Sequence, residues 1–152
     1  MVAFHEIAIP HKDILSQNYT AEVYAAKLWD VYKKRGSDEY KDSKTFFEKT
    51  YLTDNLKKIL DSIKQRLDGN GGGHFRSIST PFGGGKTHTL IALYHKCVEW
   101  NVKPVVLVGN EIDPNKETLW GMIEEQLTGK IDKLSGNVSH GGEALRQVLE
   151  KQ

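Results

Sequence analysis

A glycine-rich stretch followed by lysine and threonine constrains the fold of this chain more than any other feature. It runs from Ser79 to Thr89 and reads S-T-P-F-G-G-G-K-T-H-T. A short β-forming segment, His74–Ser79, precedes it. After it, apolar residues recur close to a 3.6-residue period, which is typical of a helix. The order strand, glycine-rich turn, helix is the context in which a phosphate-binding loop is expected.

The residue types of this stretch suit phosphate chemistry. Glycines have no Cβ and adopt positive φ easily, so successive N–H groups can turn inward and form a nest for phosphate oxygens. A helix that begins near Lys86 adds the positive end of its dipole. We expect Lys86 to contact the β- and γ-phosphates, and the Thr87 hydroxyl to hold Mg²⁺. The expected nucleotide-binding residues are Gly83, Gly84, Gly85, Lys86, Thr87, His88 and Thr89, with Lys86 also catalytic and Thr87 also the metal ligand.

The match to the P-loop pattern G-x-x-x-x-G-K-[ST] has one departure, since Thr80 stands where the first glycine is usual. Thr80 precedes Pro81, which favours an extended backbone at residue 80 and suits the end of a strand. The alternative interpretation is a glycine-rich surface turn ahead of a helix. The flanking strand and helix favour phosphate binding over that alternative.

Composition excludes several classes of protein. The chain has 152 residues, 21 basic and 20 acidic, for a net charge of +1. This balance gives no indication of nucleic acid or an anionic membrane as partner. A single cysteine, Cys97, excludes an internal disulfide framework. No apolar run has the length of a membrane span, and the N-terminus does not read as a secretory signal, so we expect a cytoplasmic protein without a membrane partner.

The N-terminal part of the chain reads as mainly helical. Residues 1–19 contain a short apolar stretch that we interpret as a strand and a turn. Apolar spacing predicts a helix over residues 21–34, and a second helical region near Ser43. A clear apolar stripe between Leu52 and Leu67 predicts a third helix, capped by Thr53 or Asp54 and stopped by Gly69. Residues 1–68 are therefore expected to form a helical N-terminal segment.

A glycine-rich hinge at residues 69–73 is expected to separate this segment from an incomplete P-loop domain at residues 74–152. The β-branched run Val105–Val108 predicts a buried parallel strand. Asp113 and Pro114 predict the start of a helix that Gly129 ends. A last helix is expected near Glu143. The expected fold class is α/β, a three-layer P-loop NTPase with a truncated sheet.

Two absences refine the functional prediction. A guanine-selective motif is missing because Gly129 stands before Lys130, and this favours adenine over guanine. P-loop NTPases also need an acidic residue at the end of a second apolar strand to hold Mg²⁺. No such strand is found, because Val105–Val108 runs into Gly109 and Asn110. We therefore expect nucleotide binding with little hydrolysis.

Several segments resemble the N-terminal part of large prokaryotic AAA+-like ATPases of an uncharacterised-domain family found in phage-defence gene clusters. The similar segments are 8–15, 26–32, 46–53, 80–95, 113–114 with 118–121, and 141–146. The loop with Thr80 resembles the form of the loop in that family. The resemblance implies ATP and Mg²⁺ as cofactors, and an acidic strand beyond Gln152. The chain is then expected to be a fragment whose partners are the remainder of the ATPase or another protein.

The sequence thus leads to one main hypothesis and one rival. The main hypothesis is the ATP-binding (Walker A) part of an AAA+-like ATPase, weak or inactive in hydrolysis alone. The rival is a non-enzymatic helical interaction module in which the glycine-rich loop is structural. Because the expected strands need neighbours, self-association into a homo-oligomer is also expected.

Overall fold

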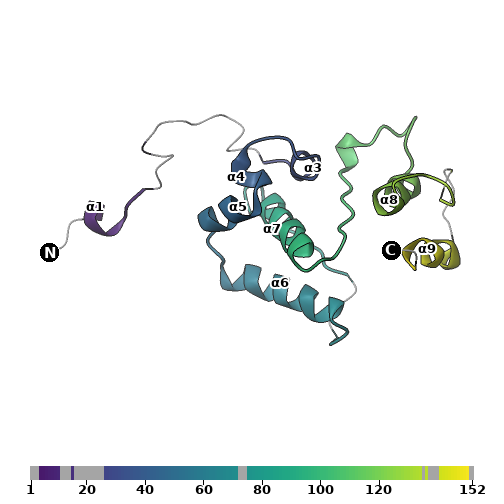
Figure 1. Cartoon of the computed structure of the whole chain (residues 1–152). Helices are drawn as coiled ribbons and strands as arrows, with labels where there is room; N and C mark the ends of the chain where they lie inside the picture. The colour runs from purple at the N-terminus through teal and green to yellow at the C-terminus, as the bar shows by residue number, and fades with distance from the viewer. Residues whose placement is uncertain are drawn as a thin grey trace.

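The computed structural model describes residues 4–10, 15, 26–71, 75–134, 136 and 141–150, and in these residues the chain is helical (Figure 1). The helices in chain order are α1 Phe4–Ile7, α3 Leu28–Tyr32, α4 Asp38–Lys41, α5 Ser43–Lys49, α6 Asp54–Leu67, α7 Lys86–Glu99, the 3₁₀ helix η2 Gly109–Glu111, α8 Leu119–Thr128 and α9 Gly142–Leu149.

The expected α/β fold is wrong, because the described residues contain no β-strand. Residues 75–79 and Val105–Val108 lack regular secondary structure, although both segments were predicted as strands; His74 lies outside the described residues. The short strand expected within residues 1–19 is also wrong where the chain is described, because Phe4–Ile7 forms α1. A strand requires backbone pairing with a neighbour, and no such neighbour is present in these parts of the chain.

The segment before η2 shows how the backbone is satisfied instead. The Val106 N–H donates to Oε1 of Gln126 at 2.8 Å, and Nε2 of Gln126 donates to the Val106 carbonyl oxygen at 2.8 Å. One side-chain amide of α8 therefore makes both of the hydrogen bonds that a neighbouring strand would make to Val106. Val106 is nevertheless buried, with only 5% of its surface exposed, although no sheet covers it in the described part of the chain.

Helices α3 to α7 share the main hydrophobic core. Figure 1 shows α5 and α6 beside α7, and α7 packs against α3, α5 and α6. The fully buried residues Ile91 and Ala92 of α7 lie at its centre, with Phe46 of α5. The remaining buried members are Val31, Leu56 and Leu60. Residues from both sides of the predicted hinge thus contribute to one core, while the predicted domain boundaries themselves stay a prediction.

Local signals placed several helix ends correctly, but the helix predicted over residues 21–34 is wrong in extent, because in the described part of that range only α3, Leu28–Tyr32, is helical. Thr53 is the N-cap of α6, and its hydroxyl accepts from the Leu56 N–H at 3.2 Å. Gly129 ends α8 in the left-handed conformation, with φ of 84°. The predicted helix start at Asp113 is wrong, because residues 114–116 form a turn and α8 begins at Leu119. The true N-cap is Thr118, whose hydroxyl accepts from the Gly121 N–H at 3.0 Å.

Helices α8 and α9 pack against each other and enclose a second, smaller core. Its buried residues are Leu127, Leu134 and Val148. Val105, from the segment that leads into η2, packs against this core. None of the helices in the described part of the chain has the length and apolar character that a membrane crossing requires.

Candidate functional site

Two of the three glycines in the glycine-rich loop have the positive φ that the sequence predicts, and Gly84 does not. Gly83 and Gly85 adopt positive φ of 79° and 75°, which other residues adopt only with strain. Gly85 is the N-cap of α7, so the helix begins at Lys86 as expected. The loop residues from Pro81 to Gly85 are exposed to solvent. The solvent-exposed loop is therefore followed directly by the first turn of α7, a helix of 14 residues.

Gly84 is required for a different reason, the close approach of Thr80. A Cβ at position 84 would lie 2.3 Å from Thr80 Oγ1 and 2.6 Å from Thr80 Cβ. The Gly84 N–H donates to the Pro81 carbonyl oxygen at 3.1 Å, and this bond closes the turn. Thr80 therefore fits this loop because residue 84 has no side chain, which accounts for the departure from the usual pattern.

Lys86 bridges the loop. Its ammonium group donates to the carbonyl oxygens of Thr80 at 2.7 Å and Pro81 at 2.9 Å, and lies 3.2 Å from Thr80 Oγ1. All three acceptors are neutral, so the positive charge of the lysine is not cancelled by a carboxylate in these contacts. The structure thus places a cation directly beside the glycine-rich turn.

The first turn of α7 presents unpaired donors next to this cation. Gly85 provides no side-chain cap. Within the described part of the chain, no hydrogen bond uses the backbone N–H groups of Lys86, Thr87 or His88. Thr87 is exposed, and Thr89 is half-buried with its N–H bonded to the Gly85 carbonyl oxygen at 2.9 Å. Uncapped N–H groups at a helix N-terminus attract anions because the helix dipole adds to their partial positive charge.

The His88 side chain contacts α5 and the residue that follows it. Its imidazole lies 4.8 Å from the ring of Phe46, between ring centroids, and Nε2 lies 3.1 Å from Thr50 Oγ1. Burial lowers the pKa of His88 below its ordinary value of 6.5, which favours a neutral ring. The structure thus brings Lys86 to the loop and the His88 ring to Phe46 and Thr50. Neither Phe46 nor Thr50 was predicted as a site residue, and no local pattern marks Thr50.

Acidic groups do not gather into a metal site in the described residues, where no cluster of three or more His, Cys, Asp or Glu is found. Asp113, where the sequence predicts the start of a helix, makes turn contacts. Its carboxylate accepts from the Asn115 N–H at 3.0 Å and pairs with Lys116 at 3.1 Å.

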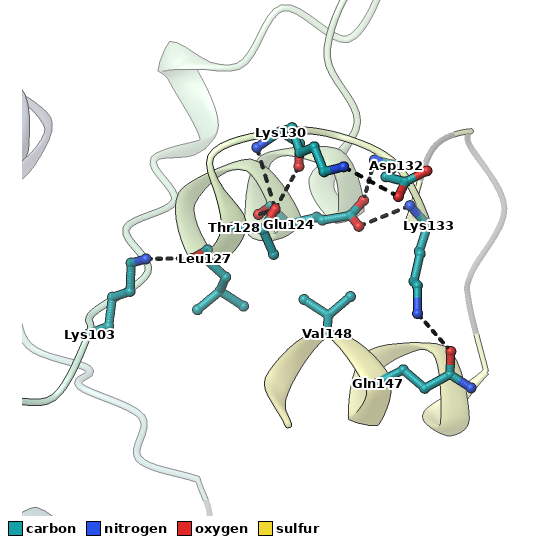
Figure 2. A pocket seen from close by; sticks show the side chains of 9 residues that line it. All are labelled: Lys103, Glu124, Leu127, Thr128, Lys130, Asp132, Lys133, Gln147 and Val148. Carbon is teal, nitrogen blue, oxygen red and sulfur yellow. Dashed lines mark hydrogen bonds and ion pairs between the residues drawn. The ribbon is translucent and has the colours of Figure 1, made fainter. Parts of the chain in front are cut away.

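A pocket of about 450 Å³ lies between α8, the segment after it, and α9 (Figure 2). Leu127 and Val148 form apolar walls, while Lys103, Lys130 and Lys133 bring ammonium groups. Each of these lysines already has a partner. Lys103 donates to the Leu127 carbonyl oxygen, Lys130 lies 3.8 Å from Asp132, and Lys133 donates to Oε1 of Gln147 at 2.9 Å. All three contacts are made to other residues that line the pocket.

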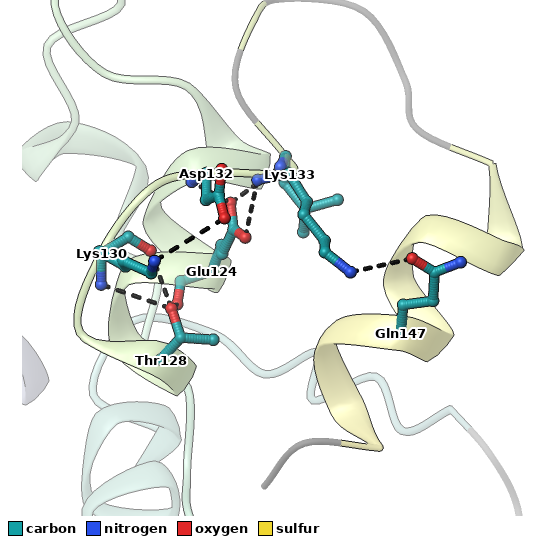
Figure 3. A network of polar contacts seen from close by, with 7 residues as sticks. Glu124, Thr128, Lys130, Asp132, Lys133 and Gln147 are labelled. Atoms are coloured by element: carbon teal, nitrogen blue, oxygen red, sulfur yellow. Dashed lines mark hydrogen bonds and ion pairs between the residues drawn. The ribbon is translucent and has the colours of Figure 1, made fainter.

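Glu124 is the main hydrogen-bond acceptor in the network of polar contacts of this region (Figure 3). Its carboxylate, 2% exposed, accepts from the backbone N–H groups of Asp132 at 2.9 Å, Lys133 at 2.9 Å and Leu134 at 2.8 Å. Burial raises the pKa of Glu124, but these three hydrogen bonds outweigh burial and hold the pKa below its ordinary value. Glu124 thus fixes the segment after α8, and no local sequence pattern predicts this because the bonds form only after that segment folds back.

Comparison with known proteins gives one positive result. The family model described as the DUF499 N-terminal domain matches residues 2–116, a range that includes the loop and all of α7. No curated protein and no solved structure matches the chain.

Proposed function

The chain belongs to the DUF499 family, and we propose that the loop Thr80–Gly85 and the first turn of α7 bind the phosphates of ATP with Mg²⁺. The observation that carries this proposal is the position of the Lys86 ammonium, which lies beside an exposed glycine-rich turn and an uncapped helix N-terminus. A cation, a flexible glycine backbone and uncapped N–H groups together suit a polyphosphate.

The residues would act in distinct ways. The ammonium of Lys86 would exchange its neutral acceptors for phosphate oxygens, which are stronger partners because they are charged. The uncapped N–H groups of Lys86, Thr87 and His88 would donate to the same phosphate groups. The Thr87 hydroxyl would be the protein ligand of a Mg²⁺ that the nucleotide brings. Magnesium would supply neutralisation of phosphate charge.

We further propose that the chain is the ATP-binding part of a larger AAA+-like ATPase from a phage-defence cluster. The similarity of residues 80–95 and of the other matching segments to that group supports this proposal. Hydrolysis would need an acidic residue near the phosphates, and the sequence predicts no apolar strand that ends in one. We therefore expect the chain alone to bind ATP with little turnover.

The test is a titration of the chain with a fluorescent ATP analogue in the presence of Mg²⁺. Lys86→Ala is expected to weaken binding by tenfold or more, because a hydrogen bond to a charged group contributes about 1.5–3 kcal/mol. Lys44→Ala is the matched control, since the Lys44 side chain is 85% exposed on α5 and its nearest carboxylate, Glu48, is 4.0 Å away.

Two results would contradict the proposal. One is a folded wild-type chain, verified by circular dichroism, that shows no saturable binding. The other is equal affinity of the wild type and Lys86→Ala. Competition with unlabelled ATP and GTP in the same titration tests the expected preference for adenine.

A further inference from the structure

The first turn of α7 is attached to the N-terminal helices at one defined point. His88, the third residue of α7, lies with its ring 4.8 Å from that of Phe46 and its Nε2 3.1 Å from Thr50 Oγ1. Thr50 is the C-cap of α5, distant in sequence from the loop. The backbone of His88 belongs to the uncapped first turn of α7, which is the proposed phosphate-binding surface. The side chain of the same residue packs on the surface formed by Phe46 and Thr50.

The surface that holds His88 is itself well fixed. Phe46 is 1% exposed and also contacts Phe47, with ring centroids 5.2 Å apart, and His95, at 5.3 Å. About two helical turns further along α7, Nε2 of His95 lies 2.8 Å from the Tyr40 carbonyl oxygen. Helix α7 is therefore held against α4 and α5 at two levels, and the level nearer the loop is the one formed by His88 and Thr50.

From these contacts we infer that Thr50 is a positioning residue for nucleotide binding, which acts through His88 to set the orientation of the phosphate-binding turn. This inference rests on the proposed function. It makes helix α5 part of the machinery that determines nucleotide affinity, although no residue of α5 needs to contact the ligand.

The hydrogen-bond chemistry supports a directional role for the Thr50 hydroxyl. A hydroxyl both donates and accepts, so it pairs with either tautomer of a neutral imidazole. The Phe46 ring lies 4.8 Å from the imidazole with the two ring planes tilted by 37°, and the Thr50 hydroxyl is the polar contact of Nε2. Loss of the hydroxyl would remove the polar link between the first turn of α7 and the end of α5, and would so loosen the position of the turn that presents the N–H groups of Thr87 and His88.

The experiment compares Thr50→Val, which keeps the shape of the side chain without the hydroxyl, with Thr50→Ser, which keeps the hydroxyl. Affinity for the fluorescent ATP analogue with Mg²⁺ is measured below the unfolding transition of every variant. We expect Thr50→Val to weaken binding about three- to tenfold, and Thr50→Ser to restore it to within about twofold. Thr128→Val is the matched control, because Thr128 donates to the Glu124 carbonyl oxygen at 3.0 Å on the separate helix α8.

A double-mutant cycle identifies the route of the effect. If Thr50 acts through His88, Thr50→Val has no further effect on affinity in a His88→Ala background. Equal effects of Thr50→Val with and without His88 would overturn the inference, as would an unchanged affinity in Thr50→Val. These results leave the proposed function standing as long as the wild type binds and Lys86→Ala does not. A folded wild type that binds no nucleotide overturns both.

Discussion

The ammonium group of Lys86 lies 2.7 Å from the backbone carbonyl oxygen of Thr80, a contact that joins the two ends of the glycine-rich loop. A second backbone carbonyl, that of Pro81, accepts from the same ammonium at 2.9 Å. The main acceptors of the lysine are therefore backbone atoms. Its position depends on the path of the chain through Thr80 and Pro81 more than on the side chain at residue 80.

This dependence predicts a mild effect for Thr80→Val. The substitution removes only the hydroxyl, 3.2 Å from the ammonium, and keeps a β-branched residue in the extended backbone before Pro81. We expect the affinity for ATP with Mg²⁺ to change by no more than about twofold, because this contact is long and exposed and the ammonium keeps its two backbone acceptors. Isothermal titration calorimetry measures this directly. A tenfold loss would instead assign a direct role to the hydroxyl.

Gly84→Ala is expected to damage the loop. The new Cβ would lie 2.3 Å from Thr80 Oγ1 and 3.1 Å from the Pro81 carbonyl oxygen, so the turn must shift. Because the same carbonyl holds Lys86, we expect nucleotide affinity to fall by about tenfold or more, the effect of losing a charged hydrogen bond. The measurement is the same titration.

The control for this substitution is Gly142→Ala in α9, where a Cβ would meet nothing within 4 Å and φ is not positive. A stricter control is the double variant Thr80→Gly with Gly84→Ala. It removes the Thr80 side-chain atoms that the new Cβ would strike, so it should recover part of the lost affinity. Equal losses in the single and double variants would show that the contact with Thr80 is not the cause.

Gln126 offers a test of how the extended segment before η2 is held. Its side-chain amide makes both hydrogen bonds to Val106, each of 2.8 Å. Gln126→Glu keeps an acceptor for the Val106 N–H but removes the donor to its carbonyl. We expect hydrogen exchange of the Val106 amide to accelerate strongly in Gln126→Ala and less in Gln126→Glu. Gln147→Ala, which removes the acceptor of Lys133, is the control and should leave this amide unaffected.

The helices and the loop were predictable because their signals are local. Hydroxyl caps, glycines in the left-handed conformation and apolar periodicity act within a few residues, as Thr53, Gly85 and Gly129 show. That Val105–Val108 forms no strand was not predictable from its composition alone. A β-branched run favours an extended backbone, but strand pairing depends on a distant neighbour, and here the partner of Val106 is a glutamine side chain.

The same distinction applies to the candidate site. The turn around Gly85 and the start of α7 at Lys86 follow from the sequence. The environment of the His88 ring does not, since Phe46 and Thr50 reach it only through the packing of α5 on α7. Whether the predicted site residues bind nucleotide stays a prediction, which the titrations above address.

Substitution of Glu124 is expected to disrupt the structure locally, without an effect on the glycine-rich loop. Glu124→Ala removes the acceptor of three backbone N–H groups, those of Asp132, Lys133 and Leu134. Leaving buried donors without a partner costs about 1–3 kcal/mol each where water cannot replace the acceptor. We expect these three amides to lose protection from hydrogen exchange and α8–α9 packing to weaken. Unchanged protection of the three amides would contradict this role.

The same carboxylate predicts a pH dependence of stability. The pKa of Glu124 in the folded chain lies below its ordinary value of 4.5, which represents the unfolded chain. The stabilisation is therefore fully present above pH 4.5 and is lost as the pH falls through the folded-state pKa, where the carboxylate binds a proton. Glu124→Gln lacks this titration. We expect the wild type to unfold at a higher temperature than Glu124→Gln at pH 7, and the difference to shrink as the pH approaches 3.

Glu48→Gln, which removes an exposed carboxylate from α5, controls for a change in surface charge. A difference between the wild type and Glu124→Gln that stays constant from pH 7 to pH 3 would show that the three backbone hydrogen bonds do not depend on the charge of Glu124.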